Sequence, residues 1–432
     1  MRSWKAWVLP SLMCGLVACD MGPSPNESRA PGTPEATAGL RAEVKAPVAA
    51  LQPKELLGRL LFFDKRLSEP PGQACASCHH PSTGWMGPDT HANGTGGVHE
   101  GAVPGRFGNR KPPSSAYATR APIFQPAIWA EGVFVGGSFW DGRATGEELG
   151  TPATDQAQLP FLNPVEQNNP NEAAVVAKVC TGPYAAHFLL LYGWTMCQPG
   201  QVARAYDNIA RAIAAYEASS EMNPFSSKYD AYLAGRARLT DQELRGLGLF
   251  EGKALCSSCH LSQRGARGEP PLFTDHTYAN LGVPRNPLNP WYEQREFNPR
   301  GWEWTDQGLG AFLQTRPEWR RYARENLGKQ KVPTLRNVDK RPNPAFVKAY
   351  MHNGYFKDLK SVVHFYNTRD ALPVCRAEGS REQAVPGVDC WPSPEVKQNV
   401  DTSQMGNLGL TSEEEDALVA FLRTLSDGYV QR

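Results

Sequence analysis

Two copies of one pentapeptide decide the fold of this chain: Cys75-Ala-Ser-Cys78-His79 and Cys256-Ser-Ser-Cys259-His260. The pattern C-x-x-C-H is typical of the covalent attachment of a c-type haem. The two thiols of each motif form thioether bonds to the porphyrin, and the adjacent histidine binds the iron. Zinc would need a further pair of ligands at similar spacing, and the sequence contains none. The two motifs therefore predict two c-type haems.

The N-terminal residues resemble a bacterial export signal. Arg2 and Lys5 precede an apolar stretch over residues 6–18, which is too short to remain as a membrane-spanning helix. Leu16-Val17-Ala18-Cys19 resembles a lipobox, which implies removal of residues 1–18 and lipidation of Cys19. Residues 19–49 are rich in Pro, Gly, Ala, Ser and Thr, a composition that predicts a flexible tether. We expect an exported protein on the periplasmic side, held to a bacterial membrane only through this lipid. Ordinary signal-peptidase cleavage without lipidation is the alternative.

The net charge restricts the expected binding partners, and the cysteine count restricts the expected disulfides. The formal net charge of +1 gives no electrostatic signal for nucleic-acid binding. Of the ten cysteines, one lies in the signal segment, one is the lipidation site and four belong to the haem motifs. Export favours disulfides among the other four, and pairing of sequence neighbours predicts Cys180–Cys197 and Cys375–Cys390. Each would stabilise the fold by about 3 kcal/mol. Four free, buried thiols are the alternative.

A repeated segment divides the chain into two similar halves. Residues 55–62 and 243–250 both fit E-L-x-G-x-x-L-F, and each precedes one haem motif. Each half also ends in a helical pattern: residues 202–218 in the first, and in the second a helix that starts at the capping box Thr411-x-x-Glu414. The length of 432 residues, with 40 glycines and 37 prolines, suits two domains with long loops. We predict a mainly α protein of two cytochrome c-type domains, residues 50–220 and 221–432, with the haems at either side of the domain interface.

Around the haem motifs the sequence resembles the di-haem cytochrome c peroxidases and their MauG-like relatives. The resemblance spans residues 50–428 and rests on these segments: Phe139-Trp140-Asp141-Gly142-Arg143, Asn163-Pro164-Val165-Glu166, Val332-Pro333-Thr334-Leu335-Arg336-Asn337 and His352-Asn353-Gly354. It implies a peroxidase whose N-terminal haem binds hydrogen peroxide and whose C-terminal haem transfers electrons.

The resemblance assigns roles to four residues near the peroxide-binding haem. Glu166 matches the distal acid, and Gln156 and Pro160 match the other distal residues. Heterolysis of the O–O bond needs a group that moves a proton from the inner to the outer oxygen, and a partly desolvated carboxylate can do this. Proline stiffens its loop and lacks an N–H, which keeps the pocket small and dry. Trp140 matches the tryptophan that lies between the two haems, where an indole can relay electrons. A surface glutamate and a core aromatic side chain are the alternatives. The segment between Trp140 and Glu166 is longer than the family leads us to expect.

The axial ligand of the second haem separates two branches of the family. Peroxidases proper carry a methionine fourteen residues after the histidine that corresponds to His352, whereas MauG-like members carry a tyrosine. This chain has Tyr366 at that position. A thioether favours ferrous iron and a phenolate favours ferric iron, so Tyr366 predicts a low reduction potential. If Tyr366 only packs in the core, then Met351, Met405 or a histidine supplies the ligand.

The far side of the first haem and a calcium site are further expectations. His91 and His99 lie in a Gly-rich loop and could block the iron, but with a tyrosine on the second haem we expect an open site. The resemblance also implies a calcium ion held by Asn109 and by the backbone carbonyls of Val347 and Ala349, because hard oxygen ligands suit Ca²⁺. An ordinary turn residue is the alternative for Asn109.

The predicted function is therefore that of a di-haem peroxidase of MauG-like type. It reduces hydrogen peroxide at the N-terminal haem and shares the oxidising equivalents, through Trp140, with the C-terminal haem. The donor is expected to be a protein: a small c-type cytochrome, a cupredoxin, or a partner that is modified at its own Trp or Tyr residues. The oligomeric state is left open by the sequence; because family members are often dimers, a homodimer is one alternative. The rival function is a non-catalytic di-haem electron-transfer cytochrome, which predicts two six-coordinate haems and no distal acid. A haem oxygenase acting on a polymer or hydrocarbon is a third alternative, and no feature of the sequence supports it.

Overall fold

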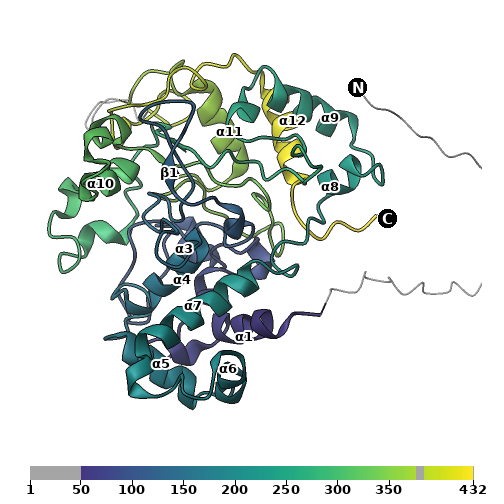
Figure 1. Ribbon diagram of the computed structural model, residues 1–432. Helices are drawn as coiled ribbons and strands as arrows, with labels where there is room; N and C mark the ends of the chain where they lie inside the picture. The colour runs from purple at the N-terminus through teal and green to yellow at the C-terminus, as the bar shows by residue number, and fades with distance from the viewer. Residues whose placement is uncertain (1–49, 376–383, 432) are drawn as a thin grey trace, which may run out of the picture. The chain divides into compact units, whose positions relative to one another are not determined.

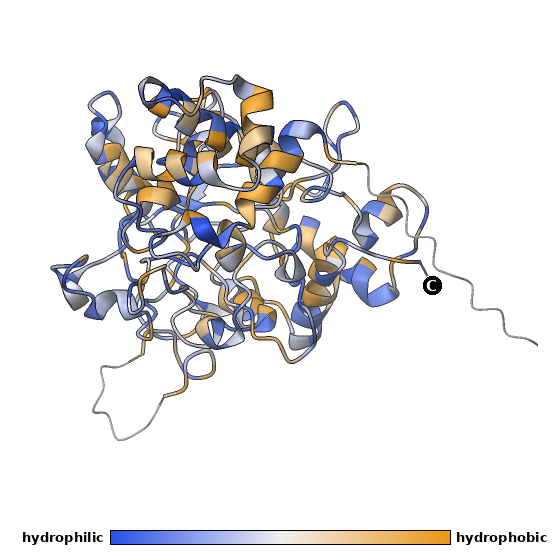
Figure 2. Cartoon of the chain, turned by 90° about the horizontal axis from the view of Figure 1, so that it is seen from below, coloured by the Kyte–Doolittle hydropathy of each residue, from blue (hydrophilic) through white to orange (hydrophobic). Residues whose placement is uncertain are grey.

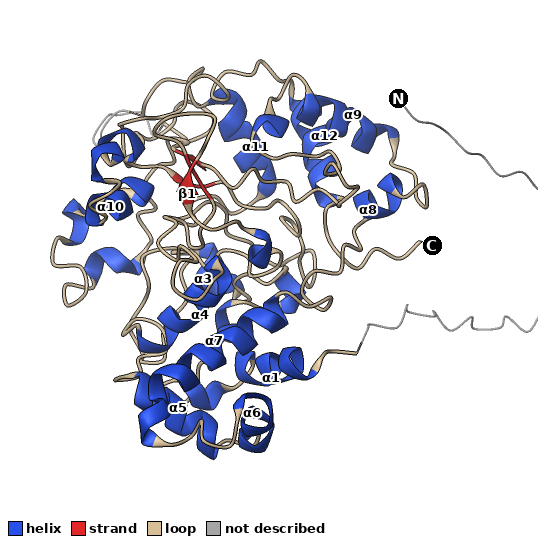
Figure 3. Cartoon of the chain, in the orientation of Figure 1, coloured by secondary structure: helices blue, strands red, loops and turns tan. Residues whose placement is uncertain are grey.

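The computed structural model describes residues 50–375 and 384–431; the predicted signal segment, Cys19 and the tether lie outside these ranges. The described chain is mainly helical, as predicted, with long loops and short strands (Figure 3). The α-helices are α1 (Pro53–Phe62), α2 (Cys75–Cys78), α3 (Thr90–Gly94), α4 (Pro152–Leu162), α5 (Glu172–Thr181), α6 (Ala185–Tyr192), α7 (Val202–Glu217), α8 (Lys228–Leu233), α9 (Asp241–Glu251), α10 (Gly308–Thr315), α11 (Leu359–Thr368) and α12 (Ser412–Arg423). The 3₁₀ helices are η1 (Lys65–Leu67), η2 (Pro81–Thr83), η3 (Ala118–Arg120), η4 (Pro199–Gln201), η5 (Cys256–Ser258), η6 (Pro290–Glu293), η7 (Gly301–Glu303), η8 (Arg320–Tyr322) and η9 (Arg324–Asn326). The strands are β1 (Gln125–Pro126), β2 (Phe134–Val135), β3 (Tyr278–Ala279) and β4 (Gln330–Lys331).

The repeated segments form α1 and α9, as predicted, and each packs against the last long helix of its half. α1 lies against α7, and α9 lies against α12 (Figure 1). The glycine of each repeat allows this close approach. A Cβ atom on Gly58 would overlap the carbonyl oxygen of Ala212, and a Cβ atom on Gly246 would overlap that of Ala417. The shared glycine of the repeat is therefore explained by helix packing.

Capping residues fix where these helices begin. Glu414 N–H donates to the Thr411 hydroxyl (3.3 Å) while Thr411 N–H donates to the Glu414 carboxylate (3.0 Å), which confirms the predicted capping box of α12. α9 begins in the same way, with Thr240 and Glu243 in these two positions (3.3 and 2.7 Å). α7 ends at residue 217, one residue before the predicted end.

Two hydrophobic clusters form most of the core, one around each helix pair. The first draws its side chains from residues 57–222 and the second from residues 229–425. A third, smaller cluster joins both halves of the sequence through Phe124, Phe134, Tyr278, Leu309, Leu313 and Ala323. Figure 2 shows the corresponding pattern, in which helices carry both hydrophobic (orange) and hydrophilic (blue) residues. The domain boundary between residues 220 and 221 stays a prediction.

Two antiparallel strand pairs connect loop segments. β1 pairs with β2, and β3 pairs with β4 in a register that sets Tyr278 opposite Lys331.

No single helix in the described part of the chain is long and apolar enough to cross a membrane. α5 and α6 pass that test only together, as a pair bent by 108°.

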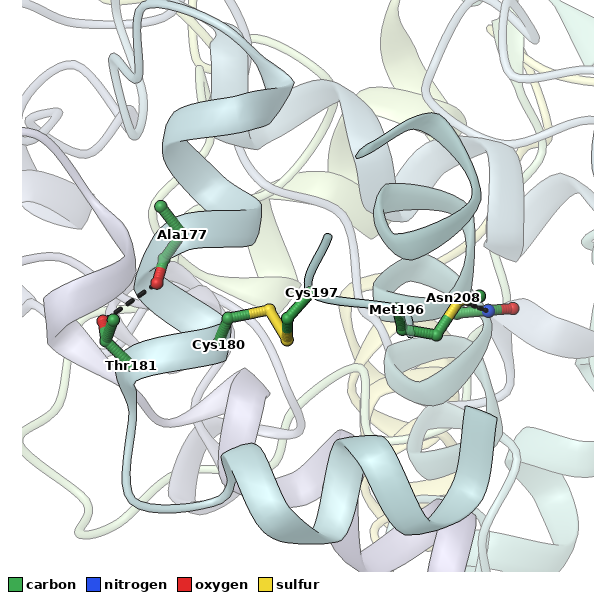
Figure 4. Close-up of a disulfide and its surroundings, with 6 residues drawn as sticks. All are labelled: Ala177, Cys180, Thr181, Met196, Cys197 and Asn208. Carbon is green, nitrogen blue, oxygen red and sulfur yellow. Dashed lines mark hydrogen bonds between the residues drawn. A yellow bond between two sulfur atoms is a disulfide. The ribbon is translucent and has the colours of Figure 1, made fainter. Parts of the chain in front are cut away.

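Both predicted disulfides are present. Cys180, near the end of α5, pairs with Cys197 (Figure 4), and Cys375 pairs with Cys390. The first closes the loop that carries α6 and brings it back to the start of α7. Its surroundings are fixed by local contacts, among them the Thr181 hydroxyl donating to the Ala177 carbonyl (2.8 Å). The alternative of four free thiols is therefore wrong for this fold.

Candidate functional site

Each haem motif forms one tight turn at the wall of a cavity. In the first motif, α2 covers the two cysteines, and His79 N–H donates to the Cys75 carbonyl (2.9 Å). In the second, η5 opens the motif, and His260 N–H donates to the Cys256 carbonyl (2.9 Å). The turn brings the cysteines and the histidine of one motif to the same wall, and all four cysteines carry free thiols.

Both motif histidines are oriented by a backbone carbonyl. His79 Nδ1 donates to the Trp85 carbonyl (3.2 Å), and His260 Nδ1 donates to the Phe273 carbonyl (2.8 Å). Nε2 of each ring is thereby left for a metal, in the way that metal-binding histidines are usually oriented. Burial lowers the pKa of His79 to about 4, so this imidazole is neutral, which is the form that binds iron. Free thiols, oriented imidazoles and enclosed walls together fit one covalently attached haem in each cavity.

The first cavity, of about 410 Å³, gathers the predicted distal residues. Gln156 and Pro160 lie one turn apart on α4, so both reach the same side of the helix. Glu166 follows in a turn in which its N–H donates to the Asn163 carbonyl (3.0 Å) and its carbonyl accepts from Ala102 N–H (2.7 Å). All three side chains line the cavity together with the first haem motif.

Asp155 organises the long loop that precedes α4. Its carboxylate accepts hydrogen bonds from the N–H groups of Gly146 (2.6 Å) and Leu149 (2.8 Å). Thr151 then caps α4 by accepting from Thr154 N–H (3.2 Å). The unexpectedly long segment is thus a tied loop followed by a helix, and that helix carries Gln156 into the cavity.

Electrostatics around Glu166 favour proton exchange. Burial raises the pKa of Glu166, and nearby Arg143 and the Asn163 side chain partly oppose this shift. Arg143 is itself held by two hydrogen bonds to Asp141 (2.9 and 3.0 Å), and its guanidinium lies over the Phe139 ring at 3.8 Å. A carboxyl group with a raised pKa can both accept and return a proton, as the distal role requires.

Trp140 lines both cavities. Its side chain is 7% exposed, and its indole N–H donates to the Lys111 carbonyl (2.8 Å). Its own carbonyl accepts from Lys331 N–H (2.7 Å) on β4. The Lys111 ammonium lies 5.9 Å from the ring centroid, and the His352 ring lies 6.4 Å away. The indole is therefore fixed at the boundary between the two haem motifs.

A buried ion network supports this boundary. Arg110 donates to Asp141 (2.6 Å) and, through two nitrogens, to Asp306 (2.6 Å each). Asp306 also lies 4.0 Å from His352 Nε2. Burial raises the pKa of Asp306, but Arg110 outweighs it and holds that pKa well below its usual range. Because Asp141 directly follows Trp140, the network fixes the backbone that carries the indole.

The second cavity, of about 190 Å³, contains Tyr366 and the alternative candidates for the second axial ligand, including one histidine outside the haem motif, His352. Tyr366 of α11, Met351 and Met405 line it with the second haem motif. Burial raises the pKa of Tyr366, so a phenolate there needs a positive charge close by, such as a ferric iron. His364 is not on this wall: its ring bonds to Glu415 and to the Gly387 carbonyl (2.8 Å each).

Of the two loop histidines and the three predicted calcium ligands, some line the first cavity and others do not. His99 lines the first cavity, whereas His91 is exposed and does not. Asn109 and Ala349 line the first cavity, but Val347 does not, and its carbonyl accepts from Asn93 (3.1 Å). In residues 50–375 and 384–431, no three His, Cys, Asp or Glu side chains converge as a metal site. An ion near Asn109 would therefore depend on amide and carbonyl oxygens.

Sequence reasoning missed charged or titratable side chains of the first cavity, and four of them are described here. Lys111, Lys331, Glu217 and His276 all line it. Burial lowers the pKa of Lys331 to about 7 and that of Lys111 to about 8. None of the four belongs to a motif with a characteristic spacing. Only Glu217 carries a signal that could have revealed it, a departure from the internal repeat at the end of α7.

Comparison with known proteins shows which family the chain belongs to. The family profile described as di-haem cytochrome c peroxidase matches residues 52–238. The methylamine utilization protein MauG of Paracoccus denitrificans (strain Pd 1222) is 36% identical over 373 residues, which cover 86% of this chain and 88% of MauG. The cytochrome-c peroxidase IdrP1 of Denitromonas iodatirespirans is 28% identical over 399 residues, which cover 88% of this chain and 84% of IdrP1. The crystal structure of the diheme peroxidase BthA from Burkholderia thailandensis E264 has a TM-score of 0.70 at 33% identity and covers 88% of each chain. This chain therefore belongs to the di-haem cytochrome c peroxidase family of haem oxidoreductases, which implies two c-type haems.

Proposed function

We propose that this protein is a peroxidase of MauG-like type that reduces hydrogen peroxide in the first cavity and oxidises a protein donor. The haem attached to Cys75 and Cys78 would supply the iron that binds peroxide and takes up its oxidising equivalents. The observation that carries the proposal is that Glu166, Gln156 and Pro160 line the same cavity as the first haem motif. In this proposal, residues 50–220 and 221–432 are the two haem domains.

Glu166 moves the proton. Its carboxylate accepts the proton of the inner peroxide oxygen and returns it to the outer oxygen, which then leaves as water. The Gln156 amide, fixed on α4, orients the peroxide by hydrogen bonding. Pro160 offers no N–H, and together with Ala153 and Ala157 it gives this wall an apolar surface that excludes water.

Trp140 relays electrons between the cavities. Its indole N–H donates to a carbonyl rather than to a carboxylate, so the ring keeps its proton when it loses an electron. Tyr366 is the proposed second ligand in the other cavity, with Met405 as the alternative. A calcium ion held by Asn109 and by the carbonyls of Val347 and Ala349 would support the boundary region.

The electron donor is a protein. The relatives include a methylamine utilization protein and cytochrome-c peroxidases, so the proposed donors are a partner modified at its Trp or Tyr residues, a small c-type cytochrome or a cupredoxin. We further propose that the protein is exported, lipid-anchored through Cys19 on the periplasmic side, and a homodimer.

A matched pair of variants tests the role of Glu166. Glu166→Gln keeps the shape of the side chain but cannot take a proton, so the rate of the reaction with peroxide should fall by about 10²–10⁴-fold. Glu148→Gln, an exposed glutamate of the loop before α4, should react like the wild type. Both variants should keep two haems, measured by the pyridine haemochrome assay. An undiminished rate in Glu166→Gln would refute the assignment.

A further inference from the structure

Glu217 is a carboxyl group in the first cavity that the proposed reaction does not use. It is the last residue of α7, is 4% exposed and lines the same cavity as Glu166. No other described residue donates a hydrogen bond to its carboxylate or pairs with it as an ion; the Asn223 side chain donates to its backbone carbonyl instead (2.6 Å). An unpaired carboxylate in such a place is expensive, and the C-terminal end of a helix adds to the cost because the helix dipole is negative there.

The internal repeat shows that this carboxyl group is a departure from the apolar pattern. Gly58 meets Ala212 and Tyr216 on α7, and Gly246 meets Ala417 and Phe421 on α12 in the same register. The residues that follow Tyr216 and Phe421 are thus counterparts, and they are Glu217 and Leu422. Leu422 lines the second cavity, as Glu217 lines the first. One haem cavity therefore has a carboxyl group where the other has a methyl-bearing side chain.

One charged side chain on each of the helices α1, α4 and α5 around α7 is engaged with another partner. Arg59 of α1 pairs with Glu221, Asp155 of α4 caps the loop before it, and Lys178 of α5 binds the Asn169 side chain. Other titratable side chains on these elements and on the cavity wall are Lys54, Glu55, Cys75, Cys78, His79, His99, Arg110, Lys111, Tyr117, Arg120, Arg143, Glu166, Glu172, His276, Lys331 and Tyr350. Among them only Cys75 interacts with Glu217, and a thioether at Cys75 carries no charge. Burial alone raises the pKa of Glu217 to about 8.

We propose that Glu217 is the redox-linked proton site of the first haem cavity: it binds one proton when one electron enters that cavity and releases the proton when the electron leaves. The electron comes from a one-electron protein donor, and the proton comes from solvent. Charge then balances, because one negative charge and one positive charge arrive together. The inference rests on the proposed attachment of a haem to Cys75 and Cys78, and it does not require peroxide turnover.

Potentiometric titration of the holoprotein at different pH values tests this role. The midpoint potential of the first haem should fall with rising pH, with a slope that approaches the tenfold-per-unit limit of about 59 mV for one electron and one proton. Glu217→Gln, which keeps the size of the side chain, should flatten this slope, and Glu217→Leu, the counterpart residue of α12, should flatten it too. Glu148→Gln should keep it. A slope in Glu217→Gln equal to that of the wild type would overturn the proposal.

Redox difference infrared spectroscopy gives a second readout that does not depend on potentials. Reduction of the wild type should produce the C=O band of a protonated carboxyl group that shifts in heavy water, and this band should be absent in Glu217→Gln. If the band persists there and disappears in Glu166→Gln, then Glu166 is the proton site and the proposal is wrong. Neither measurement uses peroxide, so a failed peroxidase test and a failed proton-site test are distinguishable.

Discussion

Alanine at Gly246 tests the helix packing on which both haem motifs depend. Gly246 lies within α9, and a Cβ atom there would overlap the Ala417 carbonyl and approach the Phe421 Cβ atom to 2.8 Å. The obstacle is largely backbone of α12, which cannot rotate away, so the two helices must separate. Gly248, two residues later on the same helix, has open space where a Cβ atom would be placed. It is therefore a matched control for helix propensity.

The two variants should change the free energy of unfolding in opposite directions. Alanine is favoured over glycine within a helix by about 1 kcal/mol, so Gly248→Ala should raise the free energy of unfolding by about that amount. Overpacking typically costs about 1–3 kcal/mol, and contact with backbone belongs at the upper end. Gly246→Ala should therefore lower the free energy of unfolding by about 2 kcal/mol after the propensity gain is included.

Urea denaturation of the holoprotein, followed by circular dichroism, measures both changes. An unchanged slope against urea concentration would show that the two variants unfold in the same way as the wild type. Equal stability of Gly246→Ala and Gly248→Ala would refute the explanation of the repeated glycine. Gly58→Ala in the first half should lower the free energy of unfolding for the same reason, because that glycine approaches the Ala212 carbonyl in the same manner.

Other changes probe the disulfide, the second ligand and the buried carboxyl group. Replacing Cys180 and Cys197 together by alanine should lower the free energy of unfolding by about 3 kcal/mol; a change of melting temperature within error would contradict this. Tyr366→Met should raise the reduction potential of the second haem and change its spectrum, and an unaltered spectrum would exclude Tyr366 as ligand. Because the folded-state pKa of Glu217 lies above its ordinary value of 4.5, the folded state binds more protons between pH 4.5 and about 8, and stability falls as pH rises through this window. Glu217→Gln should remove this pH dependence. Above pH 8 the free energy of unfolding of the variant should exceed that of the wild type by at most about 5 kcal/mol, as measured by denaturation at several pH values.

Local sequence patterns predicted the elements that are held by local chemistry. The repeated segments became α1 and α9, and the capping box at Thr411 opens α12. Counting left four cysteines after the haem motifs and the export signal were assigned, and joining sequence neighbours gave the two disulfides. In each case residues close together in the sequence determine the feature, so it can be predicted from one sequence.

Long-range arrangements could not be predicted in the same way. The Arg110 network joins residues 141 and 306, and the third hydrophobic cluster joins loops from both halves of the chain. Isolated residues such as Lys331 or His276 have no spacing that marks them, and only the packing of β3 and β4 and of the loops beside them places them at a cavity. Glu217 could have been found from the sequence in part, because an alignment of the two halves places this carboxyl group at the position that corresponds to Leu422.

The most direct test of the central claim is the addition of one equivalent of hydrogen peroxide to the purified diferric protein, followed by visible and near-infrared absorption. An open first site with Glu166 beside it predicts a rapid change of the Soret band without prior reduction. It also predicts that both haems change together, because Trp140 lines both cavities. A protein that stays spectrally unchanged until one haem has been reduced would contradict the open site, and silence in both redox states would contradict peroxidase function altogether.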